Sequence, residues 1–174
     1  MKHFLVVVDI QNDFVDAALG TNEAVGIIPA ASQKIKNFGG EIFVTFDTHF
    51  ENYLETNEGK NLPVKHCIKG TKGWELNPEI AAAISGKEYT AVEKLTFGST
   101  KLPRLIEKAA NGEDFDVTLI GLCTDICVVS NALILKANFP EKEIIVDKSC
   151  CAGVTVDTHN AALKTMQMCQ IKIC

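Results

Sequence analysis

Three residues that could act together in covalent catalysis, Asp9, Lys94 and Cys127, each follow an apolar run of the sequence. Cys127 would lie in the first turn of a helix, where partial positive charge and unpaired N–H groups lower the pKa of a thiol and could hold an oxyanion. Asp9 could then take the thiol proton and later pass it to a leaving amine, while Lys94 holds the anions in place. The alternative is that Cys127 is a small core residue beside an ordinary Asp9–Lys94 ion pair. Because three reactive residue types follow three expected strands, we favour the catalytic interpretation.

A second group of residues has the types and spacing of a metal site. Asp47 and His49 are two apart in a segment expected to be extended, so their side chains point the same way. His66, in the long loop that follows, can fold back as a third ligand, and Glu58 is a further candidate for a fourth ligand or a substrate contact. One carboxylate and two histidines with open positions suit Zn²⁺, Fe²⁺ or Mn²⁺, and nothing in the residues chooses among them. The alternative is that both histidines are solvated loop residues. A D-x-H spacing alone would favour this alternative.

The elements that must position these residues alternate along the chain. Apolar runs predict strands, and the patterns between them predict helices. The expected strands span 4–8, 42–46, 89–93, 117–122, 143–147 and 170–174. The expected helices span about 27–38, 77–83, 101–110, 124–137 and 156–168. This alternation implies right-handed βαβ crossovers and one three-layer α/β/α domain over 1–174, with a mostly parallel central sheet. The irregular segment at about 48–75 is expected to be a metal-binding or lid loop.

The order of these elements predicts a single site. In an open parallel sheet, ligands bind beyond the carboxyl ends of the strands. The expected strands end at Asp9, Asp47 and Lys94, and a fourth runs into the turn that carries Cys127, so all four side chains should meet at one rim. By contrast, His159, early in the last helix, is expected to hydrogen-bond a neighbouring element rather than to take part in catalysis.

Composition excludes several other classes of protein. The net charge of −5 argues against nucleic acid as the main partner. No stretch approaches the roughly 20 apolar residues of a membrane span, and the short apolar start does not predict a signal peptide. Seven cysteines, an odd number in a chain with a good core, do not suggest a disulfide framework, so we expect a reduced, cytoplasmic protein. No G-x-G-x-x-G follows Asp9, which argues against dinucleotide binding.

Four segments together carry a family resemblance that covers almost the whole chain. They resemble, in order and spacing, the isochorismatase-like cysteine hydrolases, which have a Rossmann-like topology, and within them the nicotinamidase/pyrazinamidase branch; the segments are 9–14 (DIQNDF), 45–49 (TFDTH), 66–73 (HCIKGTKG) and 121–128 (GLCTDICV). The resemblance implies a catalytic triad of Asp9, Lys94 and Cys127. It also implies that Asp47, His49 and His66 hold a divalent metal, with zinc as the expected ion and iron or manganese as alternatives.

The resemblance implies further features of the site. A cis peptide is expected between Leu122 and Cys123, with the backbone N–H groups of Cys123 and Cys127 as the oxyanion hole. Phe14 and Phe97 match aromatic positions that flank the ring of the substrate. Two residues depart from the family pattern: Cys123 stands where Ala is common, and Phe97 stands where an aromatic residue with a hydroxyl is frequent in nicotinamidases.

The expected function is therefore hydrolysis of a small amide, with nicotinamide and water giving nicotinate and ammonia through a thioester on Cys127. One alternative is another hydrolase of the family that acts on a different amide, ureide or carbamoyl compound. An alternative of another class is a catalytically silent protein that binds a small ligand or a metal. The expected partner is a small-molecule amide, with no nucleic acid and no membrane, and family habit suggests a homo-oligomer.

Overall fold

Six parallel strands form the central sheet of the computed structural model, which describes residues 1–174. The strand order is β3-β2-β1-β4-β5-β6, with every neighbouring pair parallel, and the strands are β1 (Lys2–Val8), β2 (Glu41–Asp47), β3 (Tyr89–Lys94), β4 (Phe115–Leu122), β5 (Glu143–Ala152) and β6 (Lys172–Ile173). The direction in which strands are added reverses between β1 and β4, and such a switch point is where doubly wound sheets bind ligands. The predicted three-layer α/β fold is confirmed, and its sheet is parallel throughout.

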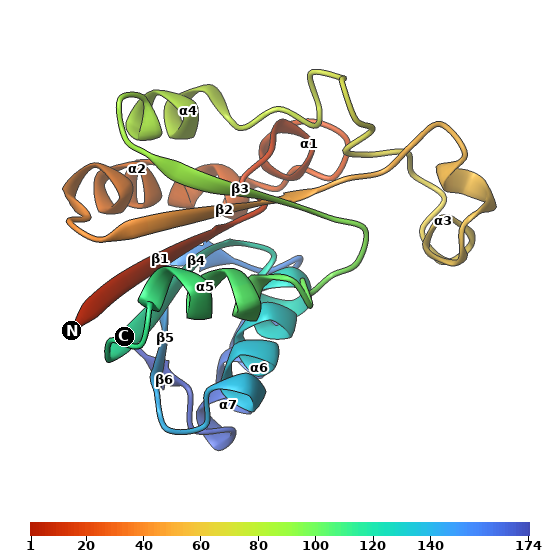
Figure 1. Ribbon diagram of the computed structural model, residues 1–174. Coiled ribbons are helices and arrows are strands. Elements are labelled where there is room, and N and C mark those ends of the chain that lie inside the picture. The colour runs from red at the N-terminus through yellow and green to blue at the C-terminus, as the bar shows by residue number, and fades with distance from the viewer.

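Helices cover both faces of the sheet (Figure 1). Helices α2 and α4 pack on one face and α5, α6 and α7 on the other; the helices are α1 (Asn12–Val15), α2 (Asn22–Asn37), α3 (Asn57–Asn61), α4 (Pro78–Ile84), α5 (Leu102–Ala110), α6 (Val129–Asn138) and α7 (Val156–Met168), with a 3₁₀ turn η1 (Tyr53–Glu55) and a π turn η2 (Thr124–Val128). The two helical layers explain the apolar run of β1. Phe4, Val6 and Val8 pack with one core cluster, Leu5 and Val7 with the other, as expected for a strand buried on both faces.

Two elements extend beyond their predicted limits. Helix α2 begins at Asn22 rather than near residue 27, because the Thr21 side chain caps it by accepting a hydrogen bond from the Ala24 N–H. Strand β5 continues to Ala152 rather than ending near 147, because its pairing with β4 shifts register after Leu119 and resumes at Gly121. The last strand, by contrast, is only Lys172–Ile173 long. These differences depend on side-chain caps and strand register, which hydrophobic periodicity does not report.

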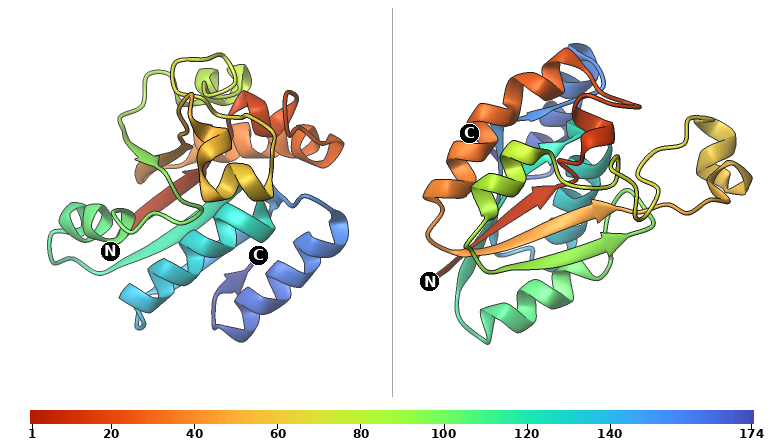
Figure 2. Two further views of the ribbon diagram at one scale, coloured as in Figure 1. Left: turned by 90° about the vertical axis from the view of Figure 1, so that its right-hand side faces the viewer. Right: turned by 90° about the horizontal axis from the view of Figure 1, so that it is seen from above.

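The irregular segment at 48–75 contains two short helical turns, η1 and α3, which the sequence pattern did not predict. It lies at the carboxyl ends of the strands, and α3 stands out from the body of the molecule, away from both termini (Figures 1 and 2). The Thr56 side chain caps α3 by accepting from the Gly59 N–H. None of the helices has the length and apolar character needed to cross a membrane.

Candidate active site

The four predicted chain positions meet at the switch point of the sheet. Val8 of β1 pairs with Gly121 of β4, so the turn after β1, which carries Asp9, lies beside the turn after β4. In the neighbouring pair of strands, Asp47 is directly paired with Lys94. Parallel register alone therefore brings these carboxylates, the lysine and the nucleophile turn to one rim.

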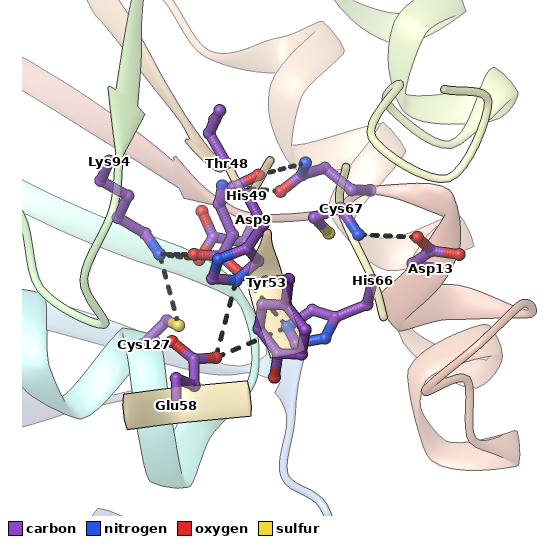
Figure 3. A network of polar contacts seen from close by, with 12 residues as sticks. Asp9, Asp13, Thr48, His49, Tyr53, Glu58, His66, Cys67, Lys94 and Cys127 are labelled. Atoms are coloured by element: carbon purple, nitrogen blue, oxygen red, sulfur yellow. Dashed lines mark hydrogen bonds and ion pairs between the residues drawn. The ribbon is translucent and has the colours of Figure 1, made fainter. Parts of the chain in front are cut away.

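Lys94 is the centre of the first group (Figure 3). Its Nζ lies 2.6 Å from Asp9 Oδ2, 3.2 Å from Asp47 Oδ1 and 3.5 Å from Cys127 Sγ. The Thr45 hydroxyl donates a 2.6 Å hydrogen bond to the other oxygen of Asp9. All five residues are buried. Of the predicted triad, Asp9 and Cys127 thus both contact the ammonium group of the third member, Lys94.

Burial sets the protonation of this group. Burial raises the pKa of Cys127 well above its usual range, and the charge of Asp9 adds to this, while Lys94 works against it. Burial likewise raises the pKa of Asp9, against the effect of Lys94. For Lys94, burial would lower the pKa, but the surrounding anionic groups outweigh it and raise the pKa. In the resting state the Cys127 thiol is therefore neutral, and it lies beside the ammonium group of Lys94. The Asp9 carboxyl group contacts the same ammonium group.

The expected low pKa of the Cys127 thiol is not what the structure supports. Cys127 lies in the π turn η2 and is only 4% exposed, so the loss of solvation outweighs the partial charge of the helix terminus. A buried neutral thiol needs a base within reach to become a nucleophile. Asp9 contacts the same Lys94 ammonium group as Cys127, which makes it the candidate to take the proton.

The chain around Asp9 and Cys127 has an unusual backbone. The peptide between Leu122 and Cys123 is cis, as the resemblance implies. Gly121 has a φ of +123°, and a Cβ there would lie 2.1 Å from the carbonyl oxygen of Val8, so only glycine fits between β1 and β4. Asp9 itself has a φ of +47°, in the left-handed region that aspartate tolerates better than most residues. A non-glycine residue held at positive φ, as Asp9 is, is often found at a functional site.

The second group contains the predicted metal ligands. Asp47, His49, Glu58 and His66 each offer one donor atom, and these four atoms all lie within 4.8 Å of one another. The Nε2 atoms of His49 and His66 lie 2.9 Å and 3.5 Å from Asp47 Oδ2, and both lie 3.6 Å from Glu58 Oε1. Glu58, the weakest candidate in the sequence, is therefore a full member of the group.

This donor set fits a divalent metal ion. Ligand atoms at 2.0–2.2 Å from a tetrahedral zinc ion are about 3.3–3.6 Å apart. The separations of 3.5 Å from His66 to Asp47 and of 3.6 Å from each histidine to Glu58 match this spacing. Two imidazoles and two carboxylates also suit iron or manganese. The Nδ1 atom of His66 lies 2.8 Å from the Val64 carbonyl, which fixes the ring so that Nε2 faces the group.

The ring of Tyr53 packs against the imidazoles of His49 and His66. Its ring centroid lies 4.7 Å from that of His49 and 5.0 Å from that of His66, both edge-on. Its hydroxyl donates a 2.9 Å hydrogen bond to the Leu62 carbonyl just after α3. Tyr53 is fully buried and so links both imidazoles to the segment that carries Glu58.

A cavity of about 230 Å³ adjoins both groups. Its wall is mostly apolar and consists of Phe14, Leu19, Thr21, Asp47, Glu58, Leu62, Phe97, Cys123, Ile126, Cys127 and Val154. It is smaller than the usual pockets for drug-sized ligands, so it suits a small molecule. The two predicted aromatic residues, Phe14 and Phe97, line it together with Cys127.

Sequence reasoning missed several residues of this site. Thr45, which bonds Asp9, and Tyr53, which contacts both histidines, were not predicted, nor were the apolar residues Leu62 and Val154 of the cavity wall. A signal for Thr45 existed, since it is paired with Val8, the residue before Asp9. The others come from segments whose packing leaves no periodic trace. His159 hydrogen-bonds a neighbouring element, as predicted, because its Nδ1 lies 2.8 Å from the hydroxyl of Thr124.

Fold and site together define an α/β protein with an acid and a cysteine in contact with one lysine, beside a group of side chains that could hold a metal ion. Residues 3–174 match the family model described as the isochorismatase domain. The chain belongs to the isochorismatase family and is a hydrolase of that family.

The relatives agree with this membership. A Bacillus subtilis (strain 168) protein described as an isochorismatase family protein, PncA, is 30% identical over 176 residues, which cover 94% of this chain and 93% of the relative. The structure is similar to that of the pyrazinamidase/nicotinamidase from Streptococcus mutans UA159, with a TM-score of 0.83, 28% identity and coverage of 99% of this chain and 100% of that one. It is also similar to the pyrazinamidase of Pyrococcus horikoshii in complex with zinc, with a TM-score of 0.84, 25% identity and coverage of 100% and 99%. The predicted family resemblance is confirmed.

Proposed function

We propose that this protein is a cysteine amidohydrolase whose substrate is nicotinamide, which it converts with water to nicotinate and ammonia. The observation that carries the proposal is the contact of Lys94 with both Asp9 and Cys127, at 2.6 Å and 3.5 Å, with Cys127 in the wall of a small, mostly apolar cavity. The similar proteins from Streptococcus mutans and Pyrococcus horikoshii, which are described as a pyrazinamidase/nicotinamidase and a pyrazinamidase, support the choice of reaction.

Acylation begins with the proton of the thiol. Asp9 takes it, and the resulting thiolate of Cys127 attacks the carboxamide carbon and forms the C–S bond. The backbone N–H groups of Cys123 and Cys127 donate to the oxygen that becomes negative. Asp9 then passes the proton to the nitrogen of the substrate, the C–N bond breaks, and ammonia departs. The acyl group remains on Cys127 as a thioester. Lys94 remains an ammonium ion throughout and offsets the negative charge that moves between acid and sulfur.

Deacylation uses the same groups in reverse order. Asp9 takes a proton from a water molecule, whose oxygen attacks the thioester carbon. The C–S bond breaks, the proton on Asp9 returns to the sulfur of Cys127, and nicotinic acid is released, which ionises in solution to nicotinate. The sum is one amide and one water consumed, one acid and one ammonia formed.

Asp47, His49, Glu58 and His66 are the residues that would hold a metal ion in this protein. A divalent metal ion bound there supplies a Lewis-acidic anchor for a lone pair of the substrate. Because Asp47 also accepts a hydrogen bond from Lys94, the anchored end of the substrate and the thiol are held on one rigid frame.

The cavity wall supports an uncharged aromatic substrate. Phe14 and Phe97 line it with apolar neighbours, and no arginine or lysine is among its lining residues. The wall thus offers no basic side chain to pair with a substrate carboxylate, which disfavours acidic amides and ureido acids. Phe97 has no hydroxyl, so its contribution to binding is packing against the ring.

The test is ammonia and nicotinate formation from nicotinamide by the purified protein. Cys127→Ala should abolish turnover and keep the folded structure, whereas Cys123→Ala, at the other thiol of the cavity, should retain it because only the backbone of residue 123 takes part. His49→Ala should lower the metal content of the purified protein and raise KM. Turnover by Cys127→Ala, or none by a folded, metal-loaded wild type, would contradict the proposal.

A further inference from the structure

The turn that carries the nucleophile is held from the outside by the junction between β5 and α7. Thr124, between the two proposed oxyanion donors Cys123 and Cys127, is fully buried, and its hydroxyl lies 2.8 Å from Nδ1 of His159. The next residue, Asp125, accepts the backbone N–H of Val154 with both carboxylate oxygens, at 3.2 Å and 3.1 Å. Two successive residues of the π turn are therefore tied to one junction.

The junction is built for close approach. A Cβ on Gly153 would lie 2.9 Å from Cβ of His159 and 3.0 Å from its Cα, so a glycine is needed where the chain enters α7. Thr155 and Thr158 form a capping box that fixes the start of the helix, and Thr158 is the residue just before His159. Val154, in the same junction, lines the substrate cavity. The position of the His159 backbone is thus determined by its close packing against Gly153 and by the fixed start of α7.

The hydrogen bond joins the Thr124 hydroxyl to a neutral imidazole. Burial lowers the pKa of His159, although Asp125 partly opposes this, so the imidazole is neutral near pH 7. With the ring proton on Nε2 the Thr124 hydroxyl donates to Nδ1, and with the proton on Nδ1 the ring donates to the hydroxyl oxygen, so a neutral ring joins Thr124 in either tautomer. The backbone on both sides of Thr124 then has one preferred orientation.

We propose that His159 is a positioning residue that acts through Thr124 to aim the backbone N–H groups of the nucleophile turn at the developing oxyanion. The proposal rests on the proposed function, because it assigns those N–H groups to the oxyanion of an acyl transfer. His159 does not touch the substrate or the sulfur, so its loss should leave binding and thiol reactivity intact. The loss of His159 should instead weaken the stabilisation of the tetrahedral intermediates of acyl transfer.

His159→Leu removes the ring partner of the hydrogen bond, Thr124→Val removes the hydroxyl partner at constant shape, and His159→Asn keeps a hydrogen-bonding group at the δ position. We expect His159→Leu and Thr124→Val each to lower kcat for nicotinamide about 10- to 100-fold, since misplaced donors cost on this order, with little change in KM. The double variant should be no worse than either single variant, because both remove one interaction. His159→Asn should restore most of kcat. His3→Leu, which removes a histidine paired with Asp116 far from the site, is the matched control.

A second readout separates positioning from mere stability. Pyridine-3-carbaldehyde adds to a thiol to give a thiohemiacetal, whose oxygen occupies the oxyanion position. Its affinity, measured as protection of Cys127 from iodoacetamide, should fall by the same factor as kcat, while the unprotected alkylation rate should not change. Thr124→Val preserves shape and serves if His159→Leu fails to fold.

Additive effects of the two substitutions, or a loss of kcat with unchanged aldehyde affinity, would overturn the positioning role. The aldehyde measurement needs no turnover. A wild type that is protected by the aldehyde but releases no ammonia would therefore refute nicotinamide as substrate and still test the role of His159.

Discussion

The ammonium group of Lys94 donates a 3.2 Å hydrogen bond to Oδ1 of Asp47, whose Oδ2 faces His49 and His66. One carboxylate therefore belongs to both groups of the site. The hydrogen bonds from these imidazoles and the charge of Lys94 outweigh burial, which would raise the pKa, and hold the pKa of Asp47 well below its ordinary value. Asp47 is thus ionised at any pH at which the protein works, as a metal ligand must be.

This contact predicts opposite effects of one substitution. Lys94→Met should abolish turnover, because Asp9 and Cys127 lose the cation that offsets their charge. It should also strengthen zinc binding, by about tenfold or more, because a positive charge next to Asp47 is removed. Competition with a chelating dye measures the affinity. Lys69→Met, at an exposed lysine paired with Glu93, should change neither quantity, and weaker zinc binding in Lys94→Met would refute the electrostatic coupling.

Thr45 should set the acid limb of the pH profile. Burial raises the pKa of Asp9, and the hydrogen bond from the Thr45 hydroxyl partly counters this by favouring the ionised form. Asp9 must be ionised to accept the thiol proton, so the acid limb of kcat/KM should lie above the ordinary aspartate pKa of 3.8. Thr45→Val removes the hydrogen bond and should move that limb to higher pH. An unmoved limb would mean that another group is the base.

Tyr53→Phe separates the two contacts of Tyr53. The variant keeps the ring against His49 and His66 and loses only the hydrogen bond to the Leu62 carbonyl. Metal content should stay at the wild-type level, while KM for nicotinamide should rise severalfold because Leu62 lines the cavity. Metal analysis and steady-state kinetics check both. Tyr53→Leu, which loses the ring as well, should also lose metal.

Asp147 should contribute to stability in a pH-dependent way. Lys34 Nζ lies 2.9 Å from Asp147 Oδ2 and joins α2 to β5. Burial would raise the pKa of Asp147, but hydrogen bonds from Ser149 and Lys34 outweigh it and lower the pKa below 3.8. A lowered folded-state pKa adds stability above the unfolded value, and this stability is lost as pH falls through the folded value. Asp147→Asn should therefore cost about 1 kcal/mol at pH 7, since the pair is partly exposed, and less at pH 3. Urea unfolding at both pH values measures this, and an equal cost at both would argue against the ion pair.

The sequence predicted the rim of the site well because strand ends are local signals. Asp9, Asp47 and Lys94 each follow a short apolar run, and the parallel register does the rest. The protonation of Cys127 was predicted wrongly, because it depends on burial by distant segments rather than on the local helix. Tyr53 was missed for the same reason, since it contacts both imidazoles only once the 48–75 segment has folded.

The most direct test of the account is the covalent intermediate. Protein mixed with nicotinamide and quenched in acid within one turnover should carry a nicotinoyl group, visible in the intact mass and assigned by peptide mapping to Cys127. Cys127→Ala should carry none, and Cys123→Ala should carry as much as the wild type. Ammonia release without any adduct on Cys127, or an adduct on Cys123 instead, would contradict the assignment of the nucleophile.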